Sequence, residues 1–285
     1  MKESGKSPCA VSLSGLSDKV PKLFGIPSGV PGLDELFFTF RVEGEEVKRV
    51  LLNGFPSASV IHLTGVPDTG KSLIGEQFSI SQALCGYNVL YVTVEIPAPF
   101  LALSFKQRSQ ALKADWDKMK ERIFIVDATR YPELRDNVGD LCAFLSETIE
   151  KEKINSTVID SITGLYEGRE MLARSIVRKL YEIMKKHYQT AIFISQKRSS
   201  HEEISSEAAG GYAVPHIVDC TIVLSKIVLN SKALATMYNK KPGEVVRTLR
   251  IDGCRMCGHD SNVHLLEIDE KGLVRVGKPL YEVLK

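Results

Sequence analysis

The stretch HLTGVPDTGKSLIGEQF, residues 62–78, decides the fold of this chain. Gly65, Gly70, Lys71 and Ser72 fit the pattern G-x-x-x-x-G-K-[ST] of a phosphate-binding loop. In such a loop the glycines permit a tight backbone path, and backbone N–H groups point at phosphate oxygens. The sequence therefore predicts a nucleotide site and leaves open whether the nucleotide is only held or also hydrolysed.

The segments on either side of the loop support this interpretation. Residues 59–64 are β-branched and apolar, as in a strand, and residues 71–85 carry apolar side chains at helical spacing. The helix N-terminus adds its positive dipole end to the phosphate site. The residues that we expect around the nucleotide are Gly65, Val66, Pro67, Asp68, Thr69, Gly70, Lys71, Ser72 and Leu73.

Further strands and helices alternate along the chain. Apolar strands are predicted at 88–95, 122–128, 155–161 and 190–196, and helices at 99–113, 137–152 and 169–188. Continuous apolar strands that alternate with helices indicate a mostly parallel central sheet flanked by helices, an α/β fold. After residue 217 short strands follow one another without an obvious long helix, which predicts C-terminal antiparallel strands at the sheet edge.

One domain accounts for most of the chain. We expect a flexible tail over 1–23, a single domain over 24–276 and a C-terminal tail over 277–285. Within the domain, residues 38–52 alternate apolar and polar side chains around Glu43-Gly44. They predict a hairpin insertion beside the first core strand.

Three polar residues follow or end the predicted strands at the edge where the loop lies. Asp160 in VIDS would hold Mg²⁺ together with the Ser72 hydroxyl, or else cap a turn. Glu95 in YVTVE could orient or deprotonate a water in line with the γ-phosphate, or be a solvated glutamate. Gln196 in FISQ could sense the γ-phosphate.

Composition excludes several classes of function. The 285 residues carry a net charge of only +2, so no global field attracts nucleic acid or acidic membranes, and a local basic groove stays open. No apolar run approaches the roughly 18 residues of a membrane span, and the N-terminus has no secretion signal. A cytoplasmic location is expected.

The cysteines divide into two groups. Cys85, Cys142 and Cys220 lie in apolar segments and are interpreted as small buried hydrophobic residues in a reducing compartment. CRMCGHDSNVH (254–264) offers two cysteines and two histidines, so zinc must be considered. The spacing argues against zinc, because no distant second pair closes a tetrahedron. A redox pair is disfavoured too, because no thioredoxin-like strand–helix context surrounds the cysteines. A turn between edge strands is preferred.

Taken together, these motifs resemble the KaiC-like branch of the RecA superfamily. GIPSGVPGLDEL, GVPDTGKS, YVTVE, VIDS and IVDCTIVL occur in the order and spacing of that branch. The resemblance implies a RecA-type core that binds ATP with Mg²⁺ between subunits of a homo-oligomer, a hexameric ring or a filament. It also implies that Glu95 is the general base. Archaeal chains of this kind are common, so an archaeal source is expected.

Two departures from the family pattern bear on turnover. Ile96 stands where members commonly have a second acidic residue after Glu95. Many members also carry a Lys-x-Arg plus His signature, of which Arg255 and His259 are present while Gly253 replaces the lysine. By resemblance, Arg255 would reach across the interface to the neighbour's nucleotide and stabilise the transition state.

Three functions remain open at this stage. The first is a slow KaiC-like ATPase, with Lys71, Glu95, Gln196 and Arg255 as catalytic residues, that couples nucleotide state to assembly or to an unknown protein partner. The second is an ATP-dependent assembly or signalling module without hydrolysis. The third is a recombinase-like accessory that binds single-stranded DNA through the polar segment 197–211. Acidic residues in that segment oppose its basic ones, and it has no aromatic platform on which bases could stack.

Overall fold

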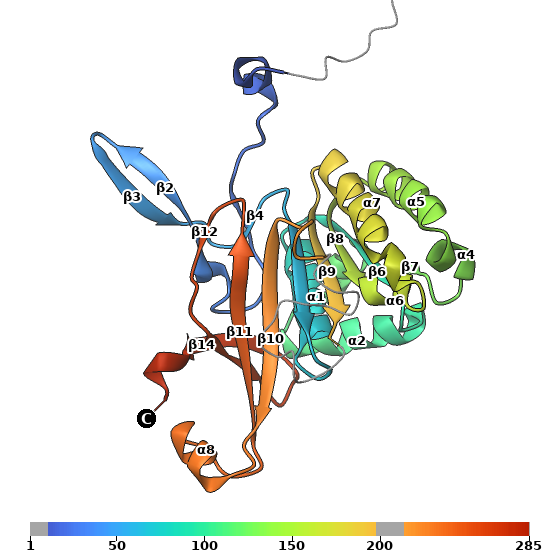
Figure 1. The fold of residues 1–285 in the computed structure, drawn as a ribbon. Helices are drawn as coiled ribbons and strands as arrows, with labels where there is room; N and C mark the ends of the chain where they lie inside the picture. Colours follow the sequence, from blue (N-terminus) through green and yellow to red (C-terminus); the bar gives the residue numbers. More distant parts are fainter. Residues whose placement is uncertain (1–10, 198–213, 285) are drawn as a thin grey trace, which may run out of the picture.

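A nine-stranded sheet crosses the computed structural model, which describes residues 11–197 and 214–284. Its strand order is β14-β13-β11-β10-β5-β9-β8-β6-β7 (Figure 1). The parallel strands are β5 (Val60–Gly65), β6 (Asn88–Thr93), β7 (Ile123–Asp127), β8 (Ile154–Asp160), β9 (Thr190–Gln196) and β10 (Cys220–Val228). The predicted α/β fold with a mostly parallel sheet is confirmed.

The antiparallel strands lie at one edge of the sheet. They are β11 (Val245–Cys254), β13 (His264–Ile268) and β14 (Val274–Pro279). β10 differs from the prediction, because it pairs parallel with β5, and the antiparallel part begins only with β11. Because β10 runs parallel to β5, it enters the sheet at the same end as the core strands.

Helices cover both faces of the sheet (Figure 1). One face packs against α1 (Lys71–Leu84), α2 (Ala98–Ala111) and α3 (Trp116–Lys120). The other face packs against α4 (Pro132–Asp136), α5 (Val138–Lys151), α6 (Ile162–Tyr166) and α7 (Ala173–Lys186). A short helix, α8 (Lys232–Met237), joins β10 to β11 and was not predicted.

Successive side chains in a core strand point to opposite faces of the sheet, and helices cover both faces. In β6, Tyr91 joins the core beneath α1 and α2, whereas Leu90 and Val92 join the core beneath α5 and α7. Both faces are buried, so no polar face is left in the sequence. This sheet positions all of the strand ends discussed below.

The predicted hairpin is present, but it does not lie beside a core strand. β2 (Phe37–Glu43) pairs with β3 (Glu46–Leu51), and the hairpin extends away from the body (Figure 1). Its second partner is β12 (Gly258–His259), so these strands form a separate three-stranded sheet. The segment after Cys257, interpreted from the sequence as a turn, is therefore paired with the hairpin.

Short elements lie near both ends of the part of the chain that the structure describes. Within the expected N-terminal tail, η1 (Leu13–Lys19) is a 3-10 helix without buried residues. β1 (Gly25–Ile26) pairs with β4 (Phe55–Pro56). The last strand continues to Pro279, into the expected C-terminal tail, and η5 (Leu280–Glu282) follows it. The remaining 3-10 helices in the part that the structure describes are η2 (Asp34–Leu36) and η3 (Glu170–Leu172).

Among the helices of 11–197 and 214–284, none has the length and apolar character to cross a membrane.

Candidate nucleotide-binding site

A cavity of about 380 Å³ opens where the loop of residues 65–72 joins β5 to α1. Parallel strands place their carboxyl ends at one edge of the sheet, so the segments after β5, β6, β8 and β9 meet there. The residues that line the cavity are Pro67, Asp68, Thr69, Gly70, Lys71, Ser72, Leu73, Glu95, Asp160, Ile194, Gln196 and Ile268. Most of the residues expected at the nucleotide are thus brought together within one chain.

The two motif glycines are required by the geometry of the loop. Gly70 has φ +94°, which disfavours any residue with a side chain, and it forms the N-cap of α1. A Cβ on Gly65 would lie 2.5 Å from the carbonyl oxygen of Leu224 on β10. Larger residues at either position would displace the loop backbone.

Lys71 is buried, and its side chain contacts the backbone of its own loop. Its Nζ donates hydrogen bonds to the carbonyl oxygens of Gly65 (2.9 Å) and Val66 (2.8 Å). Burial lowers the pKa of this lysine to about 8, although Asp160 and Glu95 act in the opposite direction. The ammonium is therefore short of compensating negative charge, and an anion in the cavity would supply it.

Asp160 ends β8 at the floor of the cavity. Burial raises the pKa of its carboxyl group, while hydrogen bonds from Ser72 and Tyr91 oppose that rise. The Tyr91 hydroxyl donates to Asp160 Oδ2 over 2.8 Å. The Ser72 hydroxyl and the Asp160 carboxylate together offer hard oxygen donors of the kind that Mg²⁺ prefers, so the residues fit the ion.

Glu95 is held by two side chains, Gln196 at the end of β9 and Ser161 at the N-cap of α6. Gln196 Nε2 donates to both of its carboxylate oxygens, at 2.9 and 3.0 Å, and Ser161 Oγ donates to Oε1 at 2.5 Å. β6 ends at Thr93, two residues earlier than predicted, because the Thr93 side chain bonds the backbone of Ile96. Ser161 was missed by the sequence reasoning, although it directly follows Asp160 in VIDS.

Two further residues that the sequence reasoning missed bind the loop from outside the motif. Arg247 on β11 bonds Asp68 through Oδ2 (2.6 Å) and through the backbone carbonyl (2.8 Å). Lys226 on β10 approaches the same carboxylate at 3.5 Å. These cations lower the pKa of Asp68, and burial acts against them. Only the pairing of β10 with β11 reveals them, since Lys226 lies opposite Arg247 in that register.

Arg255 does not lie in this cavity. Cys254 pairs with Cys220 at the start of β10, whereas the loop follows Gly65, which pairs with Leu224 farther along β10. Arg255 is exposed, and its Nη2 donates to the carbonyl oxygen of His216 at 3.0 Å. It is therefore remote from the nucleotide cavity of its own chain.

The family position of Gly253 has room for a side chain. A Cβ there would meet no atom within 4 Å, so sterics do not exclude a lysine. The family lysine is therefore absent from this sequence although the packing around Gly253 would permit it.

The structure does not support a zinc site at 254–264. His264 faces β14, where Nδ1 lies 3.2 Å from the carbonyl oxygen of Gly277. Within 11–197 and 214–284, no group of three or more His, Cys, Asp or Glu is placed to hold a metal ion. Cys254 and Cys257 do approach each other, with their sulfurs 3.7 Å apart.

The polar segment 197–211 lies almost wholly outside the described residues. Lys197 is described, and it is buried, with 3% of its surface exposed. This lysine is therefore not a surface cation available to a nucleic acid, contrary to the sequence interpretation.

Comparison with known proteins gives the family. The sequence matches the KaiC ATPase family over residues 26–281. This chain belongs to the KaiC ATPase family. A solved KaiC-like protein from Pyrococcus horikoshii OT3 superposes with a TM-score of 0.67 over 90% of this chain and 100% of that one, at 22% identity. The RecA-type fold is thereby shown.

Relatives of similar length exist among proteins named UPF0273. The KaiC-family chain described here is 26% identical to one from Thermotoga maritima over 263 residues, 87% of this chain and 94% of that one. It is 30% identical to one from Sulfurisphaera tokodaii over 223 residues, 70% and 67% of the two chains. Neither printed name states an activity.

Proposed function

We propose that this KaiC-family chain is a slow, Mg²⁺-dependent ATPase that couples nucleotide state to the assembly of its subunits or to a protein partner. Family membership supports ATP binding. The observation that carries the proposal further is the position of Glu95, bonded to Gln196 and Ser161 in the cavity that also holds Lys71 and Asp160.

The loop and Lys71 bind the phosphates in this proposal. Backbone N–H groups of 65–73 and the N-terminus of α1 face phosphate oxygens, and Lys71 moves from its carbonyl partners to the β- and γ-phosphates. Ser72 and Asp160 would hold Mg²⁺, which supplies charge neutralisation for the phosphates.

Gln196 links the nucleotide to the base. While its amide bonds both oxygens of Glu95, the carboxylate has little capacity left to accept a proton from water. A γ-phosphate oxygen that accepts from Gln196 would release Glu95 to orient and deprotonate the attacking water. The state of the nucleotide then passes to the segment that follows Gln196.

The position of Arg255 supports an interface between subunits. It is exposed and remote from its own cavity, so a catalytic role for Arg255 requires the nucleotide of a neighbouring copy, in a hexameric ring or a filament. We further propose that residues 24–276 act as one domain and that the protein works in the cytoplasm of an archaeon.

A non-hydrolysing assembly module is the second candidate. Both oxygens of Glu95 are engaged, and Gly253 provides no lysine although space for one exists. Single-stranded DNA binding remains a prediction, since Lys197 is buried and the rest of the segment invoked lies outside the residues that the structure describes.

The test compares bound nucleotide, phosphate release and oligomer size for the wild type and Lys71→Ala. Lys186→Ala, an exposed lysine on α7, is the matched control. We expect only Lys71→Ala to lose ATP binding, turnover and nucleotide-dependent assembly. Equal turnover in the wild type and Lys71→Ala would contradict the proposal. Assembly without phosphate release in the wild type would select the second candidate.

A further inference from the structure

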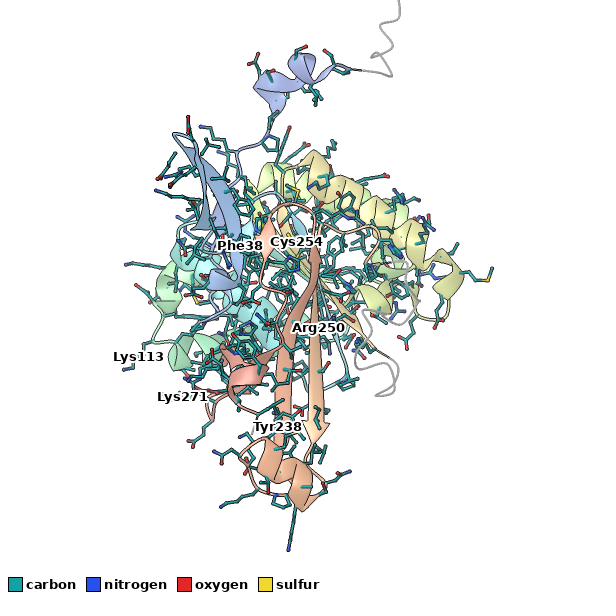
Figure 2. All side chains as sticks on the ribbon, turned by 60° about the vertical axis from the view of Figure 1, so that its left-hand side comes forward. Phe38, Lys113, Tyr238, Arg250, Cys254 and Lys271 are labelled. Atoms are coloured by element: carbon teal, nitrogen blue, oxygen red, sulfur yellow. The ribbon has the colours of Figure 1, made fainter. Side chains whose placement is uncertain are left out.

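Three cysteines that are distant in the sequence meet at one end of the sheet. Cys220 on β10 is the register partner of Cys254 on β11, and the loop after β11 returns Cys257 to the same place. In Figure 2, Cys254 lies near the hairpin residue Phe38 and far from Tyr238 at the opposite end of the long strands. The function proposed above uses none of these thiols.

The geometry favours a bond between Cys254 and Cys257. Their sulfurs lie 3.7 Å apart, so side-chain rotation can bring them to the roughly 2.05 Å of a disulfide. Both residues are partly exposed, whereas Cys220 is 1% exposed and fixed within a central strand. Cys257 also has its sulfur anchored by the backbone N–H of Phe38.

The surroundings identify the reacting thiol. Hydrogen bonds from the thiols of Cys220 and Cys257 lower the pKa of Cys254, and the same bonds raise the pKa of its two partners. A Cys254 thiolate accepts hydrogen bonds from both neighbouring thiols, which favours Cys254 as the nucleophilic form. A cavity of about 440 Å³, lined by Cys254, Arg255 and His216, gives a small reagent access to it.

We propose that Cys254 and Cys257 form a reversible redox modification site that reacts with low-molecular-weight disulfides. The Cys254 thiolate attacks one sulfur of the small disulfide, whose S–S bond breaks and releases one small thiolate. Cys257 then loses its proton, attacks the Cys254 sulfur of the mixed disulfide and displaces the second small thiolate. Two protein thiols are oxidised, one small disulfide is reduced, and the two thiol protons end on the two released small thiols.

The disulfide would close a ring around Arg255. Arg255 and Met256 are the two residues between the sulfurs, and the Arg255 backbone N–H already bonds the carbonyl oxygen of Asp219 at 2.8 Å. Oxidation thus fixes the backbone on both sides of an exposed guanidinium, and reduction releases it.

The experiment counts free thiols in the full chain, unfolded after equilibration with oxidised or reduced glutathione. The wild type has six cysteines, so the count should fall from six to four. Cys254→Ser should stay at five. Cys257→Ser should fall from five to four, because the mixed disulfide on Cys254 persists without Cys257 to displace the small thiol. Cys85→Ser, at the exposed end of α1, and Cys220→Ala should each fall from five to three.

Tryptic peptides identify the pair directly, because trypsin cleaves between the two cysteines at Arg255. A Cys254–Cys257 disulfide joins peptide 251–255 to peptide 256–271, whereas a Cys220–Cys254 disulfide joins 251–255 to 199–226. The proposal expects the first joined peptide and its loss on reduction. The second joined peptide, a disulfide between chains, or a count that stays at six would overturn it, as would one zinc per chain bound by these thiols.

Cleavage of the folded protein tests the ring. Trypsin should cut after Arg255 in the reduced protein and lose that cleavage on oxidation, with recovery under reductant. Equal cleavage of the oxidised and reduced forms would contradict the claim that the disulfide restrains the backbone at Arg255. None of these readouts depends on ATP, so their failure is distinct from failure of the proposed function.

Discussion

Lys71 is a buried cation at the proposed phosphate site. It is 8% exposed, and burial lowers its pKa from 10.5 to about 8. Between these two pH values the folded state releases the proton while the unfolded chain retains it. The unfolded state therefore binds more protons, and stability rises with pH across that range.

The rise of stability with pH gives a prediction for the nucleotide-free protein. From pH 7 to pH 10.5 the wild type should gain up to about 3 kcal/mol in unfolding free energy relative to Lys71→Met, which has no charge to bury. Denaturant unfolding of both proteins across that range measures the difference. Parallel stability curves would show that the lysine is not strained by burial.

Tyr91 orients the carboxylate that we assign to Mg²⁺. Its hydroxyl donates to Asp160, so Tyr91→Phe removes one donor and leaves the ring packing in place. Loss of such a supporting contact typically weakens metal binding about 10- to 100-fold. We expect a rise of that size in the Mg²⁺ concentration needed for half-maximal turnover.

Tyr238→Phe, in the small core around α8, is the control for this prediction. If the two phenylalanine variants share the wild-type Mg²⁺ dependence, Asp160 does not act as we propose.

At this scale the sequence predicted part of the site. Lys71, Ser72, Glu95, Asp160 and Gln196 all line one cavity, because strand ends and a known loop pattern can be located from local sequence. Arg247 and the Cys220–Cys254 contact could not be foreseen, because they depend on the register between β10 and β11. No local pattern specifies that register.

Among the elements, long strands and helices were predicted well and short ones were missed. β8 and α7 have continuous apolar runs or a clear amphipathic period, and those signals survive in the fold. β12 has two residues and α8 has six, too few for any periodicity, and both depend on contacts made by distant segments. The missed β12 is also why the partner of the hairpin was wrong.

Beyond Phe37, the β2–β3 hairpin contributes little to the core. Val42 is 70% exposed, whereas Val92 on β6 is fully buried. We expect Val42→Thr to change the unfolding free energy by less than about 0.5 kcal/mol. Val92→Thr, the same substitution, should cost about 1–3 kcal/mol because it buries a hydroxyl without a partner.

Denaturant midpoints of the two threonine variants give the comparison. A similar loss in both would mean that the hairpin is covered in the protein in solution, for instance by a second copy of the chain.

For the whole molecule, the separation of Arg255 from its own cavity is the decisive feature. A subunit that carries Glu95→Gln retains Arg255 and the capacity to bind ATP, and one that carries Arg255→Ala retains an intact cavity. If Arg255 acts on the neighbour's nucleotide, mixing the two inactive variants restores active interfaces. We expect phosphate release from the mixture at up to about a quarter of the wild-type rate, the share of interfaces that random mixing completes.

A mixture as inactive as its two components would show that Arg255 does not act across an interface. Each variant assayed alone at the same total concentration provides the baseline.

The central claim is that this cavity hydrolyses ATP with Glu95 as the base. Its most direct test is phosphate release from Mg-ATP by Glu95→Gln beside the wild type, with bound nucleotide measured on the same samples. The account predicts that Glu95→Gln binds ATP as the wild type does and loses at least about 100-fold in turnover. Turnover unchanged in Glu95→Gln, or absent from both proteins while ATP stays bound, would contradict it.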